Sequence, residues 1–120
     1  MRLKEKVSII TGAASGFGKG IAKKFSKEGA KLILADINKD LLEKVSNEIG
    51  QDFFHVDVSS SNSMKKLSEY VLKKYGNIDI MVNNAGITHL PQPLEDVSEE
   101  EFDKVFEVNS KSVFLCGKFF

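Results

Sequence analysis

Short apolar runs alternate with helix-length amphipathic stretches along the chain, and this alternation constrains the fold more than any other feature. The apolar runs predict strands over residues 7–10, 31–36, 53–58 and 78–82. Between and after them, apolar residues recur at helical spacing over about 18–28, 38–49, 60–75 and 98–120. Strands joined by helix-length segments must run parallel, with right-handed crossovers. The sequence therefore predicts a doubly wound α/β domain over residues 1–120.

Composition excludes several classes of partner. Lys plus Arg and Asp plus Glu both number 17, so a net charge of zero gives no reason to expect binding to nucleic acid or to an anionic membrane. The single cysteine, Cys116, excludes an intrachain disulfide, and no signal peptide or membrane span is evident. His55 and His89 have no metal-ligand pattern, so we expect no metal site. A cytoplasmic protein is expected.

A glycine-rich turn follows the first predicted strand. Its pattern is T-G-x-x-x-G-x-G, from Thr11 to Gly18, and a helix is predicted to open directly after it. Glycines allow a tight turn and a close approach of the backbone to a ligand. The unpaired N–H groups at a helix N-terminus suit a phosphate. A plain strand–helix turn is the alternative, but its place in a βαβ unit favours a phosphate-binding loop.

Polar residues end the next three predicted strands. Asp36 can accept hydrogen bonds from ribose hydroxyls and would repel a 2′-phosphate, which favours NAD over NADP. Asp57-Val58 can flank an adenine ring, although a solvated strand-end aspartate is nearly as plausible. Asn83-Asn84-Ala85-Gly86 could be only a turn. All of these should lie at the same sheet edge as Gly12, which favours a binding role.

Asn109 interrupts an apolar stripe on the last predicted helix. We expect the stripe to be buried, because it repeats at helical spacing through Phe102, Val105, Phe106, Val113 and Phe120. An unpaired buried amide costs about 1–3 kcal/mol, so Asn109 should have a defined partner. A structural asparagine at a helix kink and a water-binding asparagine in an active site are both consistent with this position.

Two further features bear on catalysis. Tyr70 and Lys74 form a Y-x-x-x-K pattern, but they precede the fourth strand on a helix away from the expected ligand edge. We interpret them as surface residues that share a helix face. The last helix also has no stop signal before Phe119 and Phe120, which predicts that further strands and helices of an incomplete domain follow.

Together these motifs resemble the short-chain dehydrogenase/reductase family, whose fold is a three-layer Rossmann fold. Within the family, the glycine-rich turn and the Asn-Asn-Ala-Gly motif loosely resemble those of the 3-oxoacyl carrier-protein reductase and sugar (glucose) dehydrogenase branches. The resemblance implies that Asn109 belongs to the catalytic tetrad, and that Asn83 ties the sheet together. It implies a cofactor site made of Gly12, Ser15, Gly16, Phe17 and Gly18 around the pyrophosphate, Asp36 at the ribose, Asp57 and Val58 at adenine, and Asn84, Ala85 and Gly86 along the cofactor.

The resemblance also implies an NAD-dependent oxidoreductase that interconverts an alcohol and a ketone or aldehyde. The family's catalytic serine, tyrosine and lysine would then lie beyond Phe120, so the 120-residue chain alone is expected to be inactive. A homo-oligomer, a dimer or tetramer, is expected for the full-length protein. A non-catalytic dinucleotide-binding module and an interaction fragment remain alternatives.

Overall fold

The computed structural model describes residues 1–86 and 93–120, and its centre is a parallel sheet. Pro91 and His89, which belong to the loop before the last helix, lie outside the described residues. The sheet has the order β3-β2-β1-β4. Its strands are β1 (Val7–Thr11), β2 (Lys31–Asp36), β3 (Asp52–His55) and β4 (Ile80–Val82). Chain order reverses direction at β1, as in a doubly wound fold.

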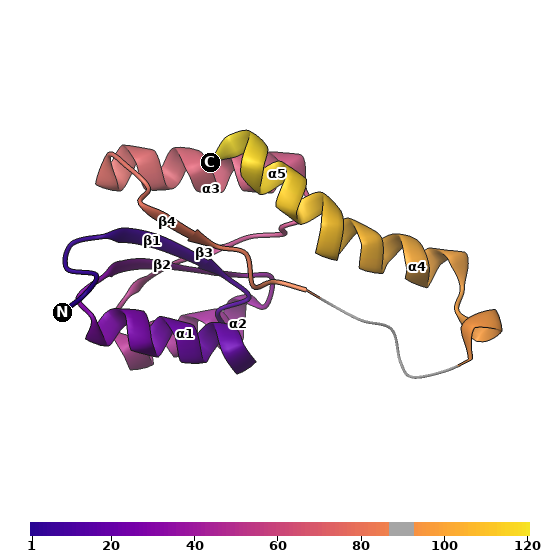
Figure 1. Cartoon of the computed structure of the whole chain (residues 1–120), viewed down its shortest axis with the longest axis horizontal. Helices are drawn as coiled ribbons and strands as arrows, with labels where there is room; N and C mark the ends of the chain where they lie inside the picture. Colours follow the sequence, from indigo (N-terminus) through magenta and orange to yellow (C-terminus); the bar gives the residue numbers. More distant parts are fainter. Residues whose placement is uncertain (87–92) are drawn as a thin grey trace.

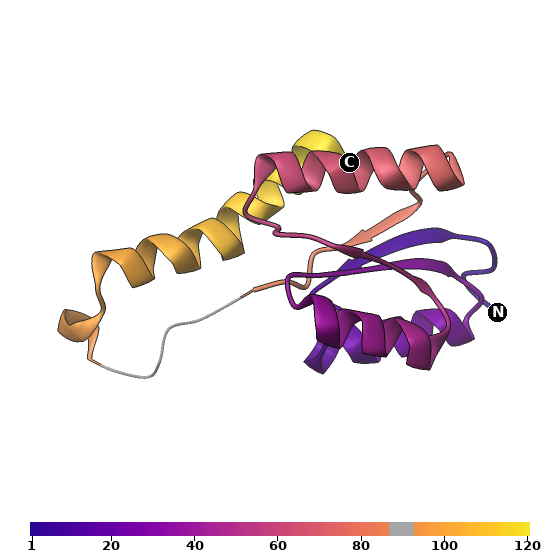
Figure 2. The same cartoon turned by 180° about the vertical axis from the view of Figure 1, so that it is seen from behind.

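Helices cover both faces of this sheet, which confirms the predicted fold class. The helices α1 and α2 lie on one face, and α3 and α5 on the other (Figures 1 and 2). The helices and helical turns are α1 (Gly16–Lys27), α2 (Lys39–Ile49), α3 (Ser61–Tyr75), η1 (Leu94–Asp96), α4 (Glu99–Phe106), η2 (Glu107–Lys111) and α5 (Ser112–Phe119).

The core has two parts because alternate residues of a strand face opposite sides of the sheet. Ile9 and Ile33 belong to the part under α3 and α5, whereas Ile10 and Leu34 belong to the part over α1 and α2. All residues of β1 are buried, as expected for a strand covered on both faces. This burial holds the carboxyl ends of β1 and β2 rigidly at one edge, where the polar residues lie.

Two strands are shorter than predicted, because side-chain hydrogen bonds replace regular strand pairing beside their ends. β3 ends at His55, and Asp57 closes the following turn by accepting hydrogen bonds from the backbone N–H (3.0 Å) and hydroxyl (2.6 Å) of Ser59. β4 begins only at Ile80, because the Asp79 carboxylate accepts a bond from the Val7 N–H at 2.8 Å. Asp57 and Val58 therefore follow a strand rather than ending one.

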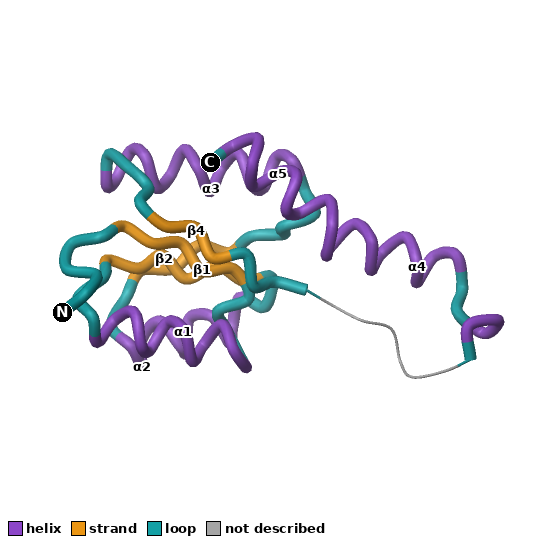
Figure 3. The backbone as a smooth tube through the Cα atoms, viewed as in Figure 1, coloured by secondary structure: helices purple, strands orange, loops and turns teal. Residues whose placement is uncertain are grey.

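The last helix runs without a break from Glu99 to Phe119 but is not α-helical throughout, and the prediction of its buried face was wrong. A π-helical turn, η2, separates α4 from α5 around Asn109. α4 projects beyond the sheet (Figure 3), so it has no sheet to cover its apolar side. Phe102 and Phe106 are 61% and 58% exposed and stack on each other, with ring centroids 6.3 Å apart. Asn109 is exposed as well.

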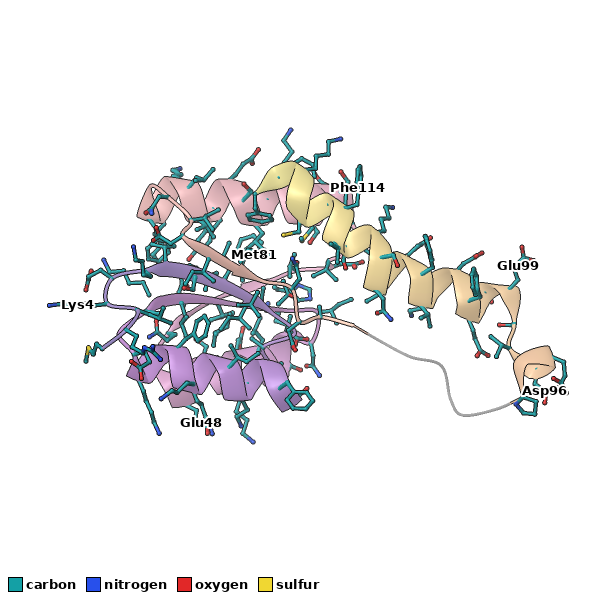
Figure 4. All side chains as sticks on the ribbon, in the orientation of Figure 1. Lys4, Glu48, Met81, Asp96, Glu99 and Phe114 are labelled. Atoms are coloured by element: carbon teal, nitrogen blue, oxygen red, sulfur yellow. The ribbon has the colours of Figure 1, made fainter. Side chains whose placement is uncertain are left out.

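α5 buries a different set of residues: Ser112, Leu115 and Cys116. Phe119 and Phe120 are partly buried and pack against the core beside α3. Figure 4 shows Met81 on β4 beneath this layer and Phe114 on the outer side of α5. Within residues 1–86 and 93–120, no helix has the length and apolar character needed to cross a membrane.

Candidate cofactor-binding site

The glycine-rich turn at the end of β1 is fastened to the end of β4. The Thr11 hydroxyl donates to the Val82 carbonyl at 3.2 Å and accepts from the backbone N–H groups of Asn84 and Ala85, both at 3.0 Å. The Asn84 side chain donates from Nδ2 to the Gly12 carbonyl at 3.3 Å. Asn84 thus links β1 to the end of β4, whereas Asn83, which was expected to tie the sheet together, is exposed.

Two positions in this turn have room only for glycine. A Cβ atom on Gly18 would lie 2.1 Å from the Gly12 oxygen and 2.6 Å from Asn84 Nδ2. A Cβ on Gly12, whose φ is +65°, would lie 2.8 Å from the same Nδ2 atom. The start of α1 is thus packed directly on the turn and on the end of β4. Glycine at both positions therefore allows this close packing, which fixes the α1 N-terminus beside the turn.

The N-terminus of α1 is open to a ligand. Ser15 is the N-cap residue with extended backbone, and its exposed side chain makes no capping hydrogen bond. The first turn holds no acidic residue, and the Phe17 side chain is 88% exposed. The N–H groups and the positive end of the helix dipole are therefore available to an anion.

Asp36 joins the glycine-rich turn to the start of α2. Its Oδ2 accepts from the Ala14 N–H at 3.0 Å, and its Oδ1 accepts from the Asn38 N–H at 2.9 Å. Each carboxylate oxygen has a further lone pair, so both can still accept a hydrogen bond from a ligand hydroxyl.

A cleft of about 440 Å³ runs between these elements. It contains most of the residues predicted to bind cofactor, namely Gly12, Ser15, Asp36, Asp57, Val58, Asn84, Ala85 and Gly86. Gly16, Phe17 and Gly18 belong to the adjoining first turn of α1 and do not line it. The cleft also has walls that the sequence analysis missed: Ile37, Val56, Lys104 and Val108. Only proximity in sequence to Asp36, Asp57 and Asn109 could have indicated three of them.

Asn109 lies beside the polar end of β4. A Cβ atom on Gly86 would be 3.2 Å from Asn109 Oδ1, so the amide is close to the Gly86 backbone. Asn109 is exposed, so what distinguishes it is its position in the η2 turn and not burial. π-Helical turns occur frequently at functional sites.

Tyr70 and Lys74 lie at the opposite edge of the sheet and are more than helix-surface residues. The hydroxyl groups of Tyr70 and Tyr75 and the Lys74 ammonium all donate to Asp52 Oδ2, at 2.7, 2.9 and 2.9 Å. Asp52 is the first residue of β3, so this Asp52 cluster (Asp52, Tyr70, Lys74, Tyr75) lies at the amino edge. The Y-x-x-x-K pattern anchors α3 to β3.

The pKa values of the Asp52 cluster follow from these contacts. Burial raises the pKa of the Asp52 carboxyl, but the bonds from Tyr70, Lys74 and Tyr75 outweigh it and leave that pKa below its ordinary value. Burial, then the hydrogen bond to Asp52, raises the pKa of Tyr75 to about 12. The hydrogen bond to Asp52 raises the pKa of Lys74, which stays protonated. These values favour an anchored ion pair over an acid–base catalyst.

Comparison with known proteins identifies the family. The sequence profile described as short chain dehydrogenase matches residues 6–120. The chain belongs to the short-chain dehydrogenase family. The resemblance inferred from the motifs is thus confirmed. The chain is 42% identical to zerumbone synthase of Zingiber zerumbet over 98% of its own length and 46% of that protein's.

Solved structures of this family agree with the fold. A 3-ketoacyl-(acyl-carrier-protein) reductase from Brucella melitensis complexed with NADH is 44% identical, with a TM-score of 0.92 over 96% of this chain and 48% of the other. The 3-oxoacyl-(acyl-carrier-protein) reductase of Thermotoga maritima is 44% identical over 95% of this chain and 48% of that protein. The chain spans about half the length of the curated relatives it matches.

Proposed function

We propose that this chain is the NAD-binding part of an oxidoreductase that interconverts an alcohol and a ketone or aldehyde. The observation that carries the proposal is the cleft in which the glycine-rich turn, Asp36 and the Asn84–Gly86 segment meet. When bound there, a nicotinamide dinucleotide supplies hydride transfer, and the protein supplies binding and orientation.

The residues present fit such a cofactor. The open α1 N-terminus with Ser15, Gly16, Phe17 and Gly18 would hold the pyrophosphate, because it offers backbone N–H groups to an anion. Asp36 would hold the adenosine ribose, and Val58, which is 8% exposed, would border adenine with Asp57. Asn84, Ala85 and Gly86 would line the remaining length of the cofactor, toward Asn109.

Asp36 is also the basis for proposing NAD over NADP. Its two oxygens face the glycine-rich turn and the start of α2, where a ribose diol can add hydrogen bonds. A carboxylate at this position repels a 2′-phosphate. The similar reductase from Brucella melitensis is complexed with NADH in its crystal structure, which supports a nicotinamide dinucleotide.

The test measures dissociation constants of NAD and NADP for the chain and for Asp36→Ala. We expect the unchanged chain to bind NAD at least about tenfold more tightly than NADP. In Asp36→Ala, the ratio of the two dissociation constants should be smaller. Asp40→Ala is the matched control, because it removes one exposed carboxylate from the neighbouring first turn of α2. Equal affinity of the unchanged chain for both dinucleotides would rule out Asp36 as the selector.

A second candidate function is dinucleotide binding without catalysis. It is favoured by the geometry of Tyr70 and Lys74, which contact Asp52 and not the cleft. Both candidate functions predict no carbonyl reduction by the 120-residue chain alone. They differ in that, under the first, we propose that the family's serine, tyrosine and lysine act in a longer parent. Measurable turnover by the isolated chain would contradict this.

The proposed parent acts on a small alcohol or carbonyl compound and forms a homo-oligomer. The exposed apolar side chains of α4 and α5 support association, since Phe102, Phe106, Val113 and Phe114 are all more than half exposed. Sedimentation or size-exclusion measurements of the parent at several concentrations test this. A parent that stays monomeric at micromolar concentration would refute it.

A further inference from the structure

His55 lies outside the cleft but contacts the turn that forms its rim. It is the last residue of β3 and pairs in register with Asp36 of β2. Its Nε2 atom lies 2.8 Å from the carbonyl oxygen of Ile37. A carbonyl oxygen can only accept, so Nε2 carries the hydrogen of this bond, in either the neutral or the charged imidazole.

The Ile37 carbonyl and the Asn38 N–H belong to one peptide group, and a peptide group is planar and rigid. His55 holds the oxygen of this plane. The N–H of the same plane donates to Asp36 Oδ1 at 2.9 Å. Rotation of the plane after loss of the His55 bond would therefore turn the N–H away from the carboxylate.

The surrounding contacts leave this peptide as the adjustable part of the turn. Asp36 is held before it by the sheet, where its carbonyl accepts from the Val56 N–H at 3.0 Å. Asn38 is held after it as the N-cap of α2, with Oδ1 accepting from the Leu41 N–H at 3.1 Å. The Ile37 side chain between them is 65% exposed and lines the cleft, so it does not anchor the turn.

We propose that His55 is a positioning residue for dinucleotide binding. It acts through the Ile37–Asn38 peptide to hold the Asp36 carboxylate in the orientation that receives the adenosine ribose. This inference rests on the proposed function of the cleft, and it assigns a role in cofactor affinity to a residue that does not line the cleft.

The experiment compares His55→Gln with His55→Asn in the chain. Glutamine carries its amide nitrogen the same number of bonds from Cα as histidine Nε2, whereas asparagine carries it one bond closer. Both variants are polar at an exposed position, so they differ mainly in reach. We expect His55→Asn to weaken NAD binding about tenfold, the effect of one lost hydrogen bond, and His55→Gln to stay within about threefold.

Two further readouts separate positioning from a general effect on folding. The Asn38 amide should exchange its hydrogen faster in His55→Asn than in His55→Gln, because its bond to Asp36 is loosened. In an Asp36→Ala background, His55→Asn should change NAD affinity less than about twofold, since the two substitutions act on one contact.

The outcomes are distinct. Loss of affinity in His55→Asn that persists undiminished in the Asp36→Ala background overturns the inference, as does an unchanged affinity in His55→Asn. Both leave the proposed function standing if the unchanged chain binds NAD. Failure of the unchanged chain to bind NAD refutes the proposed function and the inference together.

Discussion

The contact between Gly18 and the glycine-rich turn allows a matched pair of substitutions on α1. An alanine Cβ at position 18 would lie 2.1 Å from the Gly12 carbonyl oxygen, whereas one at Gly20 would meet no atom within 4 Å. Both residues belong to the same helix, and Gly20 is exposed. The pair therefore separates the effect of the close approach from the effect of replacing glycine in a helix.

The expected magnitudes follow from this geometry. Relief of the overlap requires the turn and the helix to separate by about 1 Å, and overpacking of this kind costs up to about 3 kcal/mol. Alanine recovers about 1 kcal/mol of helix propensity at either position. Gly18→Ala should thus lower the free energy of unfolding by about 2 kcal/mol, and Gly20→Ala should raise it by about 1 kcal/mol.

Thermal unfolding and NAD titration of both variants measure the two effects. For 120 residues, 1 kcal/mol corresponds to about 4 °C, so the midpoints should fall by about 8 °C and rise by about 4 °C. NAD binding should weaken at least about tenfold in Gly18→Ala only, because only that change pushes the glycine-rich turn away from α1. If both variants unfold and bind alike, the packing argument for Gly18 is refuted.

Three other predictions concern residues away from the cleft. Tyr70→Phe removes the 2.7 Å bond to Asp52 and should cost about 1–2 kcal/mol in denaturant unfolding while leaving NAD affinity unchanged; a large loss of affinity would implicate Tyr70 in the site. The pKa of Tyr75, raised to about 12, means that folding holds its proton more tightly than the unfolded chain does. The resulting stabilisation of the fold is complete below pH 10 and is lost as the pH rises through 12. After allowance for solvent screening, it amounts to about 1 kcal/mol of unfolding free energy. Tyr75→Phe should abolish this part of the loss of stability at alkaline pH. Ser8 is fully buried with no hydrogen-bond partner among the described residues, so Ser8→Ala should be neutral or stabilising by up to about 1 kcal/mol. Ser68→Ala removes the 2.9 Å bond to the Phe119 carbonyl and should lower the free energy of unfolding by a similar amount. If chemical denaturation shows Ser8→Ala to be the less stable of the two variants, the Ser8 hydroxyl is not unpaired as described.

The sequence predicts the two central strands, β1 and β2, well because they are buried on both faces. β1 has no charged residue and no polar face, and all five of its residues are buried, as expected when helices cover both sides. The carboxyl edge follows from the parallel order, so the meeting of Gly12, Asp36 and Asn84 in one cleft was predictable without side-chain detail. The ends of β3 and β4 were not, because Asp57 and Asp79 form bonds that periodicity does not reveal.

The last helix shows the limit of periodicity. An uninterrupted helical period places Asn109 on the stripe of Phe102, Phe106 and Val113, and an apolar stripe normally faces a core. The η2 turn changes the angular step at Asn109, and α4 has no sheet beneath it. Ile37 and Lys104 line the cleft but could not be predicted from the sequence, because neither an exposed isoleucine nor a lysine on a helix indicates a cleft wall.

The most direct test of the cofactor site is a measurement of where NAD binds on the chain. An NMR titration of the isotope-labelled chain follows every backbone amide as NAD is added. We predict saturable shifts that concentrate on the amides of residues 11–18, on the turn after Asp36 and on residues 84–86, with the Asp52 cluster unaffected. Shifts centred on the Asp52 cluster, or no saturable shift at millimolar NAD, would contradict the assignment of this cleft as the cofactor site.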